Sequence, residues 1–251
     1  MRIAVSSDWH GNLPSKTDRR KISECDLLLL AGDIFSHRTY YTYGVLDPVG
    51  KFLRELTDHE IPVIMTPGNH DFSIYNAWLD QNPKSAEWIL KHTVPRMSTG
   101  GEKLGVDFLK EFLGITVLID LHVEVNGLKI YGTPWTPEFY RWAFMLEEND
   151  LHEVYDRIPT GLDVLLSHGP PWVAGSNLDT VLGDKDRHCG SLALTAAISR
   201  AQPKFVFCGH IHTGDHDETI LETILGSTPC RNVSLLDEDY QVKYPPFILE
   251  V

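Results

Sequence analysis

The chain has 251 residues, of which 42% are apolar, and its 22 basic and 35 acidic residues give a formal net charge of −13. This length allows one large domain or two small ones, and the apolar fraction is sufficient for a sizeable core. The longest apolar run, Leu27 to Ala31, is far shorter than the roughly 20 residues of a membrane-spanning helix. Composition therefore excludes a disordered tail, a fibre and a membrane span, and we expect a single domain over residues 1–251.

Charge and targeting signals favour a cytoplasmic protein without general nucleic-acid binding. The apolar stretch Ile3 to Val5 is followed at once by Asp8 and is too short for a secretory signal of about 7–15 apolar residues. The densest basic patch, Arg19 to Lys21, is expected on a solvated helix face, whereas nucleic-acid binding needs larger basic clusters. Since no C-x-x-C pair occurs, we expect free thiols at all four cysteines: Cys25, Cys189, Cys208 and Cys230.

Five short apolar runs, each ended by a polar cluster, predict buried strands of an α/β domain. In chain order these runs are Ile3–Val5, Leu27–Ala31, Val63–Met65, Val164–Leu166 and Phe205–Phe207. Polar and glycine residues after each run predict that the strand ends there and that a loop follows.

The segments between these runs predict helices and a second group of strands. Apolar residues at helical spacing predict helices over Val45–His59 and Ser191–Arg200, with a partly irregular helical region over 83–114. Residues 115–133 predict three short strands, two of them joined at Asn126-Gly127, which is a typical hairpin turn. Two further strands are expected in the tail, over Asn232–Ser234 and Phe247–Val251.

The five predicted strands all end in side chains that are able to bind a metal ion. Ligands of open α/β sheets collect outside the carboxyl ends of strands, and glycine-rich loops allow close approach there. Oxygen and nitrogen donors without sulfur suit Mn²⁺, Fe or Zn²⁺, and seven donors fit two ions that share a carboxylate better than one tetrahedral ion. The seven residues are Asp8, His10, Asp33, Asn69, His168, His210 and His212.

Each of these motifs also has an ordinary structural interpretation. Asp8 alone could cap a strand, Gly68 to Asp71 could form a simple turn, and His168 could be a core histidine. Two histidines two residues apart, His210 and His212, point the same way on an extended segment and are more specific. The occurrence of all five motifs in order, each after an apolar strand, favours the metal site.

The order Asp-x-His, Gly-Asp, Gly-Asn-His-Asp, His, Gly-His-x-His, over residues 8–212, resembles the calcineurin-like metallophosphoesterase superfamily. Three further segments, Tyr131–Phe144, Ser167–Pro171 and His188–Ser191, resemble a subgroup of metallophosphoesterase-domain-containing proteins, similar in pattern to class III cyclic-nucleotide phosphodiesterases. The resemblance implies an α/β fold, a four-layer αββα sandwich with two mixed β-sheets, and hydrolysis of a small phosphoester such as a nucleotide.

The resemblance also implies a role for each site residue. Asp8, His10 and His212 would hold the first metal, and Asn69, His168 and His210 the second, with Asp33 bridging both. The implied cofactor is a pair of divalent ions, foremost Mn²⁺, with Fe, Zn²⁺ and Ni²⁺ as alternatives. Asn69 would also donate an amide hydrogen to a phosphate oxygen. His70 would protonate the leaving oxygen and would be oriented by Asp71.

The chemistry of phosphoester hydrolysis agrees with these roles. Two metals about 3.5–4 Å apart activate a bridging hydroxide and clamp the phosphate for in-line attack. A histidine, with an ordinary pKa near 6.5, is suited to supply the proton at His70. One departure from the superfamily pattern is the sequence Ser36-His37-Arg38 after Asp33, where many members have Asp-Arg. This departure disfavours a protein phosphatase.

Other functions and the specificity stay open at this point. A nuclease of the Mre11-like branch, a phosphomonoesterase and a catalytically weak metal-binding scaffold are the alternatives, and the chain is expected to be a monomer or homodimer. Aromatic residues near the motifs either stack on a substrate or belong to the core, namely Trp9, Phe35, Trp135 and Trp172. Most of the aromatic stretch up to Phe144 is expected to pack under the loops. His37, Arg38 and His188 are candidate rim contacts.

Overall fold

The computed structural model describes residues 1–35, 41–42, 45–92, 106–140, 142–181, 184–223 and 226–251. Its first sheet is mixed, with β17 antiparallel to β1 and the other neighbouring strands parallel. The strand order is β17 (Phe247–Glu250), β1 (Arg2–Ser6), β2 (Leu27–Ala31), β5 (Val63–Thr66) and β6 (Thr116–Val117).

The second sheet is also mixed, because antiparallel strands flank a parallel centre. Asn126 and Gly127 have φ angles of 52° and 79°, as the predicted two-residue hairpin turn requires. The strand order is β15 (Thr219–Thr223), β16 (Gly226–Asn232), β14 (Phe205–Cys208), β11 (Val164–Ser167), β8 (Leu128–Thr133) and β7 (Leu121–Val125).

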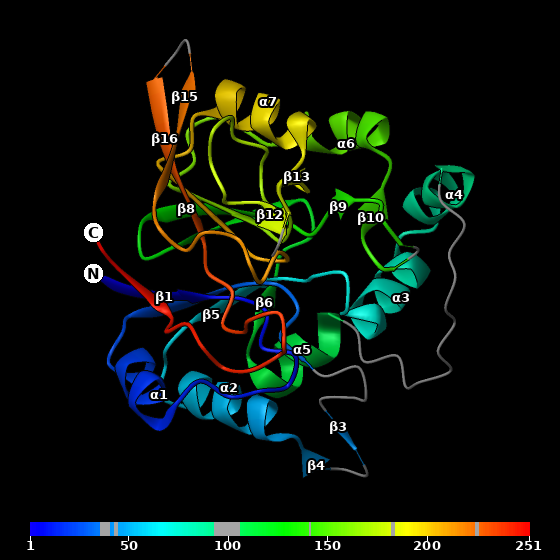
Figure 1. Cartoon of the computed structure of the whole chain (residues 1–251). Helices are drawn as coiled ribbons and strands as arrows, with labels where there is room; N and C mark the ends of the chain where they lie inside the picture. Colours follow the sequence, from blue (N-terminus) through cyan, green and yellow to red (C-terminus); the bar gives the residue numbers. More distant parts are fainter. Residues whose placement is uncertain (36–40, 43–44, 93–105, 141, 182–183, 224–225) are drawn as a thin grey trace.

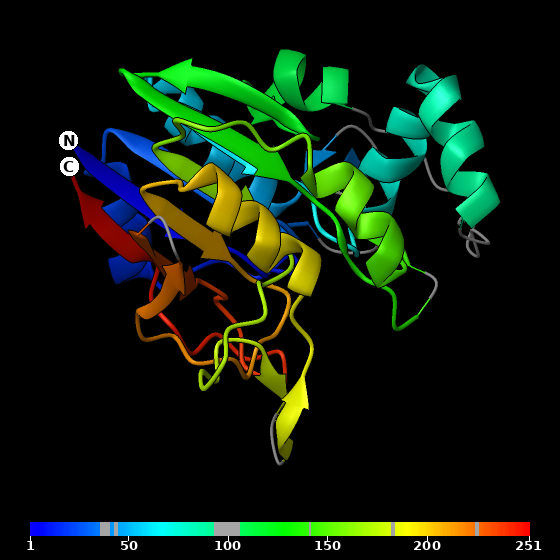
Figure 2. The same cartoon turned by 90° about the horizontal axis from the view of Figure 1, so that it is seen from above.

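Helices cover the outer face of each sheet and complete the predicted four-layer αββα sandwich (Figure 1). The first sheet is covered by α1 (Lys16–Ser23), α2 (Pro48–Asp58) and α5 (Val106–Leu113). The second is covered by α6 (Glu148–Tyr155) and α7 (Leu192–Ala201), which lie across its strands in Figure 2. Two further helices, α3 (Phe72–Gln81) and α4 (Pro83–His92), lie to one side. Three two-stranded pairs are β3 (Tyr41–Thr42) with β4 (Val45–Leu46), β9 (Thr136–Pro137) with β10 (Met145–Leu146), and β12 (Thr180–Val181) with β13 (Asp184–His188).

The continuous apolar runs of the central strands follow from burial of both sheet faces. Alternate residues of β1, Ile3 and Val5, pack between the two sheets, whereas Ala4 joins the larger cluster under the helices. Leu27 and Leu28 of β2 divide in the same way. Strands of this kind need apolar side chains at successive positions rather than at every second one.

The five predicted strands are confirmed, and the differences elsewhere have local causes. The second helix begins at Pro48 and not at Val45, because the Asp47 side chain caps Gly50 and the residues before it form β4. The strand predicted around Asn232 to Ser234 is confirmed in part, because β16 ends at Asn232 and Ser234 forms only an isolated bridge with Ser7, whereas β17 is confirmed. Residues 93–105 of the predicted helical region lie outside the described residues. Within the described ranges, no helix combines the length and the apolar character needed to cross a membrane.

Candidate metal centre

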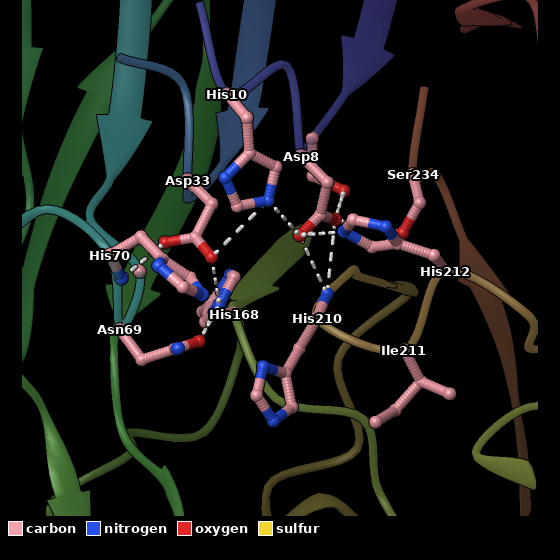
Figure 3. A network of polar contacts seen from close by, with 12 residues as sticks. Asp8, His10, Asp33, Asn69, His70, His168, His210, Ile211, His212 and Ser234 are labelled. Atoms are coloured by element: carbon pink, nitrogen blue, oxygen red, sulfur yellow. Dashed lines mark hydrogen bonds and ion pairs between the residues drawn. The ribbon is translucent and has the colours of Figure 1, made fainter. Parts of the chain in front are cut away.

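The loops after β1, β2, β5, β11 and β14 bring their polar side chains together beyond the ends of strands from both sheets (Figure 3). Three overlapping groups have ligand atoms within 4.8 Å of one another, so side chains more than 200 positions apart in sequence meet here. The groups are Asp8, His10 and His212; His10, Asp33 and His70; and Asp8, Asp33 and His168.

Glycines at three of these loops are required by the closeness of the functional side chains. A Cβ at Gly32 would overlap the His168 ring, and one at Gly68 would overlap the Asp33 carboxylate. A Cβ at Gly209 would overlap the carboxylate of Asp8. The glycine-rich loops therefore permit the convergence that the sequence predicts.

Several site residues have a backbone conformation that non-glycine residues rarely adopt. The φ angles are 53° at Asp8, 45° at His10, 55° at Asp33 and 68° at His210. Such conformations cost about 1–3 kcal/mol each and persist where surrounding structure enforces them, most often at functional sites. Four of the residues predicted to bind metal are thus held in this conformation.

Asp8 is fully buried, and its two carboxylate oxygens have different surroundings. Oδ2 accepts hydrogen bonds from the hydroxyls of Ser7 and Ser234, at 2.6 and 2.7 Å. Oδ1 faces Nε2 of His212 at 3.5 Å and Nε2 of His10 at 4.0 Å. Burial would raise the Asp8 pKa, but the hydrogen bond and charge of His212, together with the charge of His168, lower that pKa. The backbone N–H of His210 is shared between the two oxygens, at 3.0 Å from Oδ2 and 3.2 Å from Oδ1. The two hydroxyls thus hold Oδ2 alone, whereas Oδ1 faces two imidazoles.

The two carboxylate oxygens of Asp33 also have different surroundings, and this difference bears on whether Asp33 can bridge two ions. Its Oδ1 accepts the backbone N–H of His70 at 2.8 Å. Its Oδ2 lies 3.7 Å from Nε2 of His10 and 3.4 Å from Nε2 of His168. One carboxylate oxygen therefore faces imidazoles on both sides, which is the geometry that a shared ligand of two ions needs.

Backbone carbonyls fix the tautomers of two of the histidines. Nδ1 of His168 donates to the carbonyl of Ala31 at 2.9 Å, and Nδ1 of His212 donates to the carbonyl of Asp237 at 3.0 Å. Burial would lower the pKa of His168, but the Asp33 carboxylate, together with Asp8 and the carbonyl of Ala31, raises this pKa to about 9. In neutral rings the Nε2 lone pairs would face carboxylate oxygens. A cation between these donors stabilises that arrangement, so the residues fit a divalent metal.

Asn69 and His210 are the remaining predicted metal ligands, and they differ in how they lie at the site. Asn69 is fully buried and its Oδ1 lies 2.8 Å from Nε2 of His168, whereas its Nδ2 has no hydrogen-bond partner among the described residues. His210 belongs to none of the three groups, and its ring centroid lies 5.1 Å from that of His168. Burial lowers the pKa of His210 to about 3, so this ring stays neutral and retains a lone pair for a metal.

His70 lies close enough to the centre to bind metal as well as substrate. Its ring is in one group with His10 and Asp33, and its centroid lies 4.4 Å from the ring of Trp142. Proximity alone does not separate a proton donor from a ligand. The two roles differ in what removal of the ring would do to metal content.

The prediction that Asp71 orients His70 is wrong. The Asp71 Oδ2 atom accepts the backbone N–H groups of Gly68 and Asp33, at 2.8 and 3.0 Å, and Oδ1 has no partner in the described part of the chain. Burial and the neighbouring Asp33 raise the Asp71 pKa to about 7. Asp71 therefore ties the loop after β5 to the loop after β2.

A cavity of about 630 Å³ opens beside the site, and an aromatic wall forms one part of it. Phe139 and Tyr140 are 53% and 58% exposed, contrary to the expectation that this stretch packs under the loops. Trp142 of the same segment also lines the cavity. Of the aromatic residues considered from sequence, three are core residues, namely Trp9, Phe35 and Trp135. The rim candidates His37 and Arg38 lie outside the described residues.

The chain after β16 supplies three contacts that sequence analysis missed. These are the Ser234 hydroxyl on Asp8, the Asp237 carbonyl on His212, and the Tyr240 ring. The Tyr240 centroid lies 5.0 Å from that of His10 and 5.1 Å from that of His212. No local motif surrounds these residues. Long-range contacts bring them to the site, among them the isolated pairing of Ser7 with Ser234 and the backbone hydrogen bonds of Ser7 with Val233 and Leu235.

Ser234→Ala is expected to weaken metal binding about 10- to 100-fold, the usual effect of removing a group that supports a metal ligand. The substitution removes one of two hydroxyls that donate to Asp8 Oδ2 and changes little volume. Competition with a chromogenic chelator measures the change. Ser23→Ala on the exposed side of α1 is the control, and equal metal affinities for the two variants would contradict the expectation.

Comparison with known proteins was made on sequence and on structure. The model of the family "Calcineurin-like phosphoesterase" matches residues 1–214. A UPF0046 protein of Caenorhabditis elegans is 29% identical over 238 residues, covering 93% of this chain and 56% of the relative. Metallophosphoesterase domain-containing protein 1 of Homo sapiens is 29% identical over 254 residues, covering 100% of this chain and 71% of the relative. The chain thus spans little more than half of the nematode relative.

Among solved structures, the phosphopantetheinyl hydrolase of Mycobacterium tuberculosis is similar in fold. Its TM-score is 0.53 at 16% identity, over 97% of this chain and 93% of that one. At this identity the likeness concerns the fold alone. It agrees with the two-sheet sandwich described above.

Proposed function

Because the chain belongs to the calcineurin-like phosphoesterase family, we propose that it is a dinuclear metal-dependent phosphodiesterase acting on a small phosphoester such as a cyclic nucleotide. The observation that carries the proposal is the position of Asp33 Oδ2, which faces His10 on one side and His168 on the other. A single carboxylate oxygen between two sets of donors is what two neighbouring cations require.

The proposal assigns each side chain to one of two ions. Asp8, His10 and His212 hold the first ion, Asn69, His168 and His210 hold the second, and Asp33 holds both. All donors are oxygen or nitrogen, which favours Mn²⁺ and leaves Fe, Zn²⁺ and Ni²⁺ as alternatives. The ions, when bound, supply a water nucleophile at neutral pH and neutralise charge on the phosphoryl group.

The remaining chemistry belongs to side chains of this protein. Asn69 Nδ2, buried and without a partner among the described residues, donates to a non-bridging phosphoryl oxygen. His70 protonates the leaving alkoxide, and Trp142 packed against it holds the ring toward the cavity. The carbonyls of Ala31 and Asp237 keep two imidazoles in the tautomer that binds metal through Nε2.

The cavity supports a substrate with an organic group beside the phosphate. Its volume, about 630 Å³, exceeds the needs of inorganic phosphate, and aromatic rings form part of its wall. A nucleobase could stack on Phe139, Tyr140 or Trp142. With no Lys cluster in the described lining and a net charge of −13, a long nucleic acid is a poorer fit.

Metal removal tests the proposal. Chelator-treated protein is expected to lose hydrolysis of bis(p-nitrophenyl) phosphate and to regain it with Mn²⁺, with p-nitrophenyl phosphate cleaved more slowly. The 2′,3′- and 3′,5′-cyclic adenosine monophosphates are assayed in parallel for the substrate. Faster cleavage of the monoester would indicate a phosphomonoesterase, and no turnover with Mn²⁺, Fe²⁺, Zn²⁺ or Ni²⁺ would indicate a scaffold.

A further inference from the structure

A histidine in the cavity lining, His188, is bonded to the buried carboxylate of Asp179, and the proposed hydrolysis uses neither group. Asp179 is fully buried, and its Oδ1 accepts a hydrogen bond from Nδ1 of His188 at 2.8 Å. Its Oδ2 accepts the backbone N–H of Gly190 at 2.8 Å. Burying a carboxylate without hydrogen bonds costs free energy. The two hydrogen bonds to Asp179 offset that cost.

The pair is fixed rigidly to the loop that follows His168. A Cβ at Gly190 would lie 2.6 Å from the carbonyl carbon of Pro171 and 2.7 Å from Asp179 Oδ2, so only glycine allows this packing. The backbone N–H of Trp172 donates to the carbonyl of Ser191 at 3.1 Å. The segment His188–Ser191, one of the motifs of the sequence, therefore lies against the loop after β11.

His188 has one ring nitrogen, Nε2, that Asp179 does not occupy. The ring lines the cavity and 27% of the side chain is exposed. Nδ1 is occupied by Asp179, and Nε2 has no hydrogen-bond partner among the described residues. With Nδ1 bonded to the carboxylate, Nε2 is the ring nitrogen that can accept a hydrogen bond from a ligand. This is an acceptor held in place for a donor on a ligand.

The charged side chains around the cavity indicate what kind of ligand group would donate a hydrogen bond to His188. The phosphate is drawn to the metal centre, and the cavity is also lined by two carboxylates, Glu138 and Glu238. Arg187 is the single Lys or Arg of the described lining. Apart from the proposed metal ligands, the described lining therefore has more hydrogen-bond acceptors than cationic side chains. Such a surface suits a neutral hydroxyl-bearing group better than a second anion.

We propose that His188, positioned by Asp179, accepts a hydrogen bond from a hydroxyl on the organic part of the phosphoester, so that the site prefers sugar-like alcohols. This inference rests on the proposed function for the position of the phosphate. His188 is then a substrate-binding residue, and Asp179 is a positioning residue that fixes its tautomer and ring orientation.

The test compares two ligands that share a phosphate and a five-carbon chain, D-ribose 5-phosphate and n-pentyl phosphate. Their affinities for the Mn²⁺-loaded protein are measured by titration calorimetry. His188→Ala is expected to weaken binding of the sugar phosphate about fivefold, within the range for one hydrogen bond. Binding of n-pentyl phosphate is expected to stay the same. His122→Ala, on the exposed side of β7, is the matched control.

Every outcome decides the proposal. Equal weakening of both ligands, or a fall in metal content, would show that His188 is structural, and the absence of any effect would show that it does not contact the hydroxyl. Should His188→Ala fail to fold, His188→Gln replaces it and is judged by the same ligand difference. Ribose 1,5-bisphosphate tests whether His188 binds a second anion instead. If it bound more tightly than ribose 5-phosphate and His188→Ala lost this difference, the hydroxyl assignment would also be overturned. Failure of the proposed function appears separately, as absent metal-dependent cleavage of bis(p-nitrophenyl) phosphate.

Discussion

Asp33→Asn is expected to remove at least one of the two metal ions and to lower turnover of a phosphodiester at least about 100-fold. Removal of groups that only support a ligand already costs about 10- to 100-fold, and Asp33 is assigned to both ions. The amide is neutral, so it cannot offset the charge of two divalent cations as the carboxylate does. Elemental analysis of the purified variant and steady-state assays at saturating Mn²⁺ measure the two effects.

The control for this substitution is Asp163→Asn. Asp163 accepts the backbone N–H of Lys129 and pairs with Lys204 away from the cavity, and an asparagine oxygen can still accept the former bond. This variant is expected to keep two ions and normal turnover. Two retained ions and unchanged turnover in Asp33→Asn would contradict the bridging role.

The strand-end motifs were predictable because each combines a short apolar run with a change to glycine and polar residues. The runs are apolar at successive positions since both faces of each sheet are buried, as at Leu27 and Leu28. The convergence of Asp8 and Asp33 followed from general topology, because the neighbouring parallel strands β1 and β2 bring their carboxyl ends to one edge. His168 comes from the second sheet, and its place beside Asp33 depends on how the two sheets pack. The residue pattern thus predicted the two sheets with their covering helices and most residues of the site.

What sequence reasoning missed depends on tertiary contacts without a local pattern. The hydroxyl of Ser234 and the carboxylate of Asp8 are 226 positions apart, and nothing around Ser234 marks it as a site residue. Asp71 resembles a partner for its neighbour His70, yet the loops place its oxygen on the N–H groups of Gly68 and Asp33. The loop backbone, which the residue pattern does not specify, decides which of these contacts forms.

His70→Ala is expected to lower the rate about 10²- to 10⁴-fold, the usual contribution of a general acid, while metal content stays at two ions per chain. The effect should depend on the leaving group. A p-nitrophenolate leaves without much help from an acid, whereas an alkoxide needs the proton. We therefore expect a smaller loss for bis(p-nitrophenyl) phosphate than for a cyclic nucleotide, measured as kcat for both substrates.

The position of His70 makes this experiment decisive, because its ring lies within ligand distance of His10 and Asp33. A metal ligand and a proton donor respond differently to its removal. If His70 were a ligand, metal content and rate would fall together and both substrates would lose activity alike. His152→Ala, on the exposed side of α6, controls for loss of a histidine elsewhere. A leaving-group dependence at constant metal content would assign the proton to His70, and its side-chain contact with Trp142 would then explain how the ring is kept at the reacting oxygen.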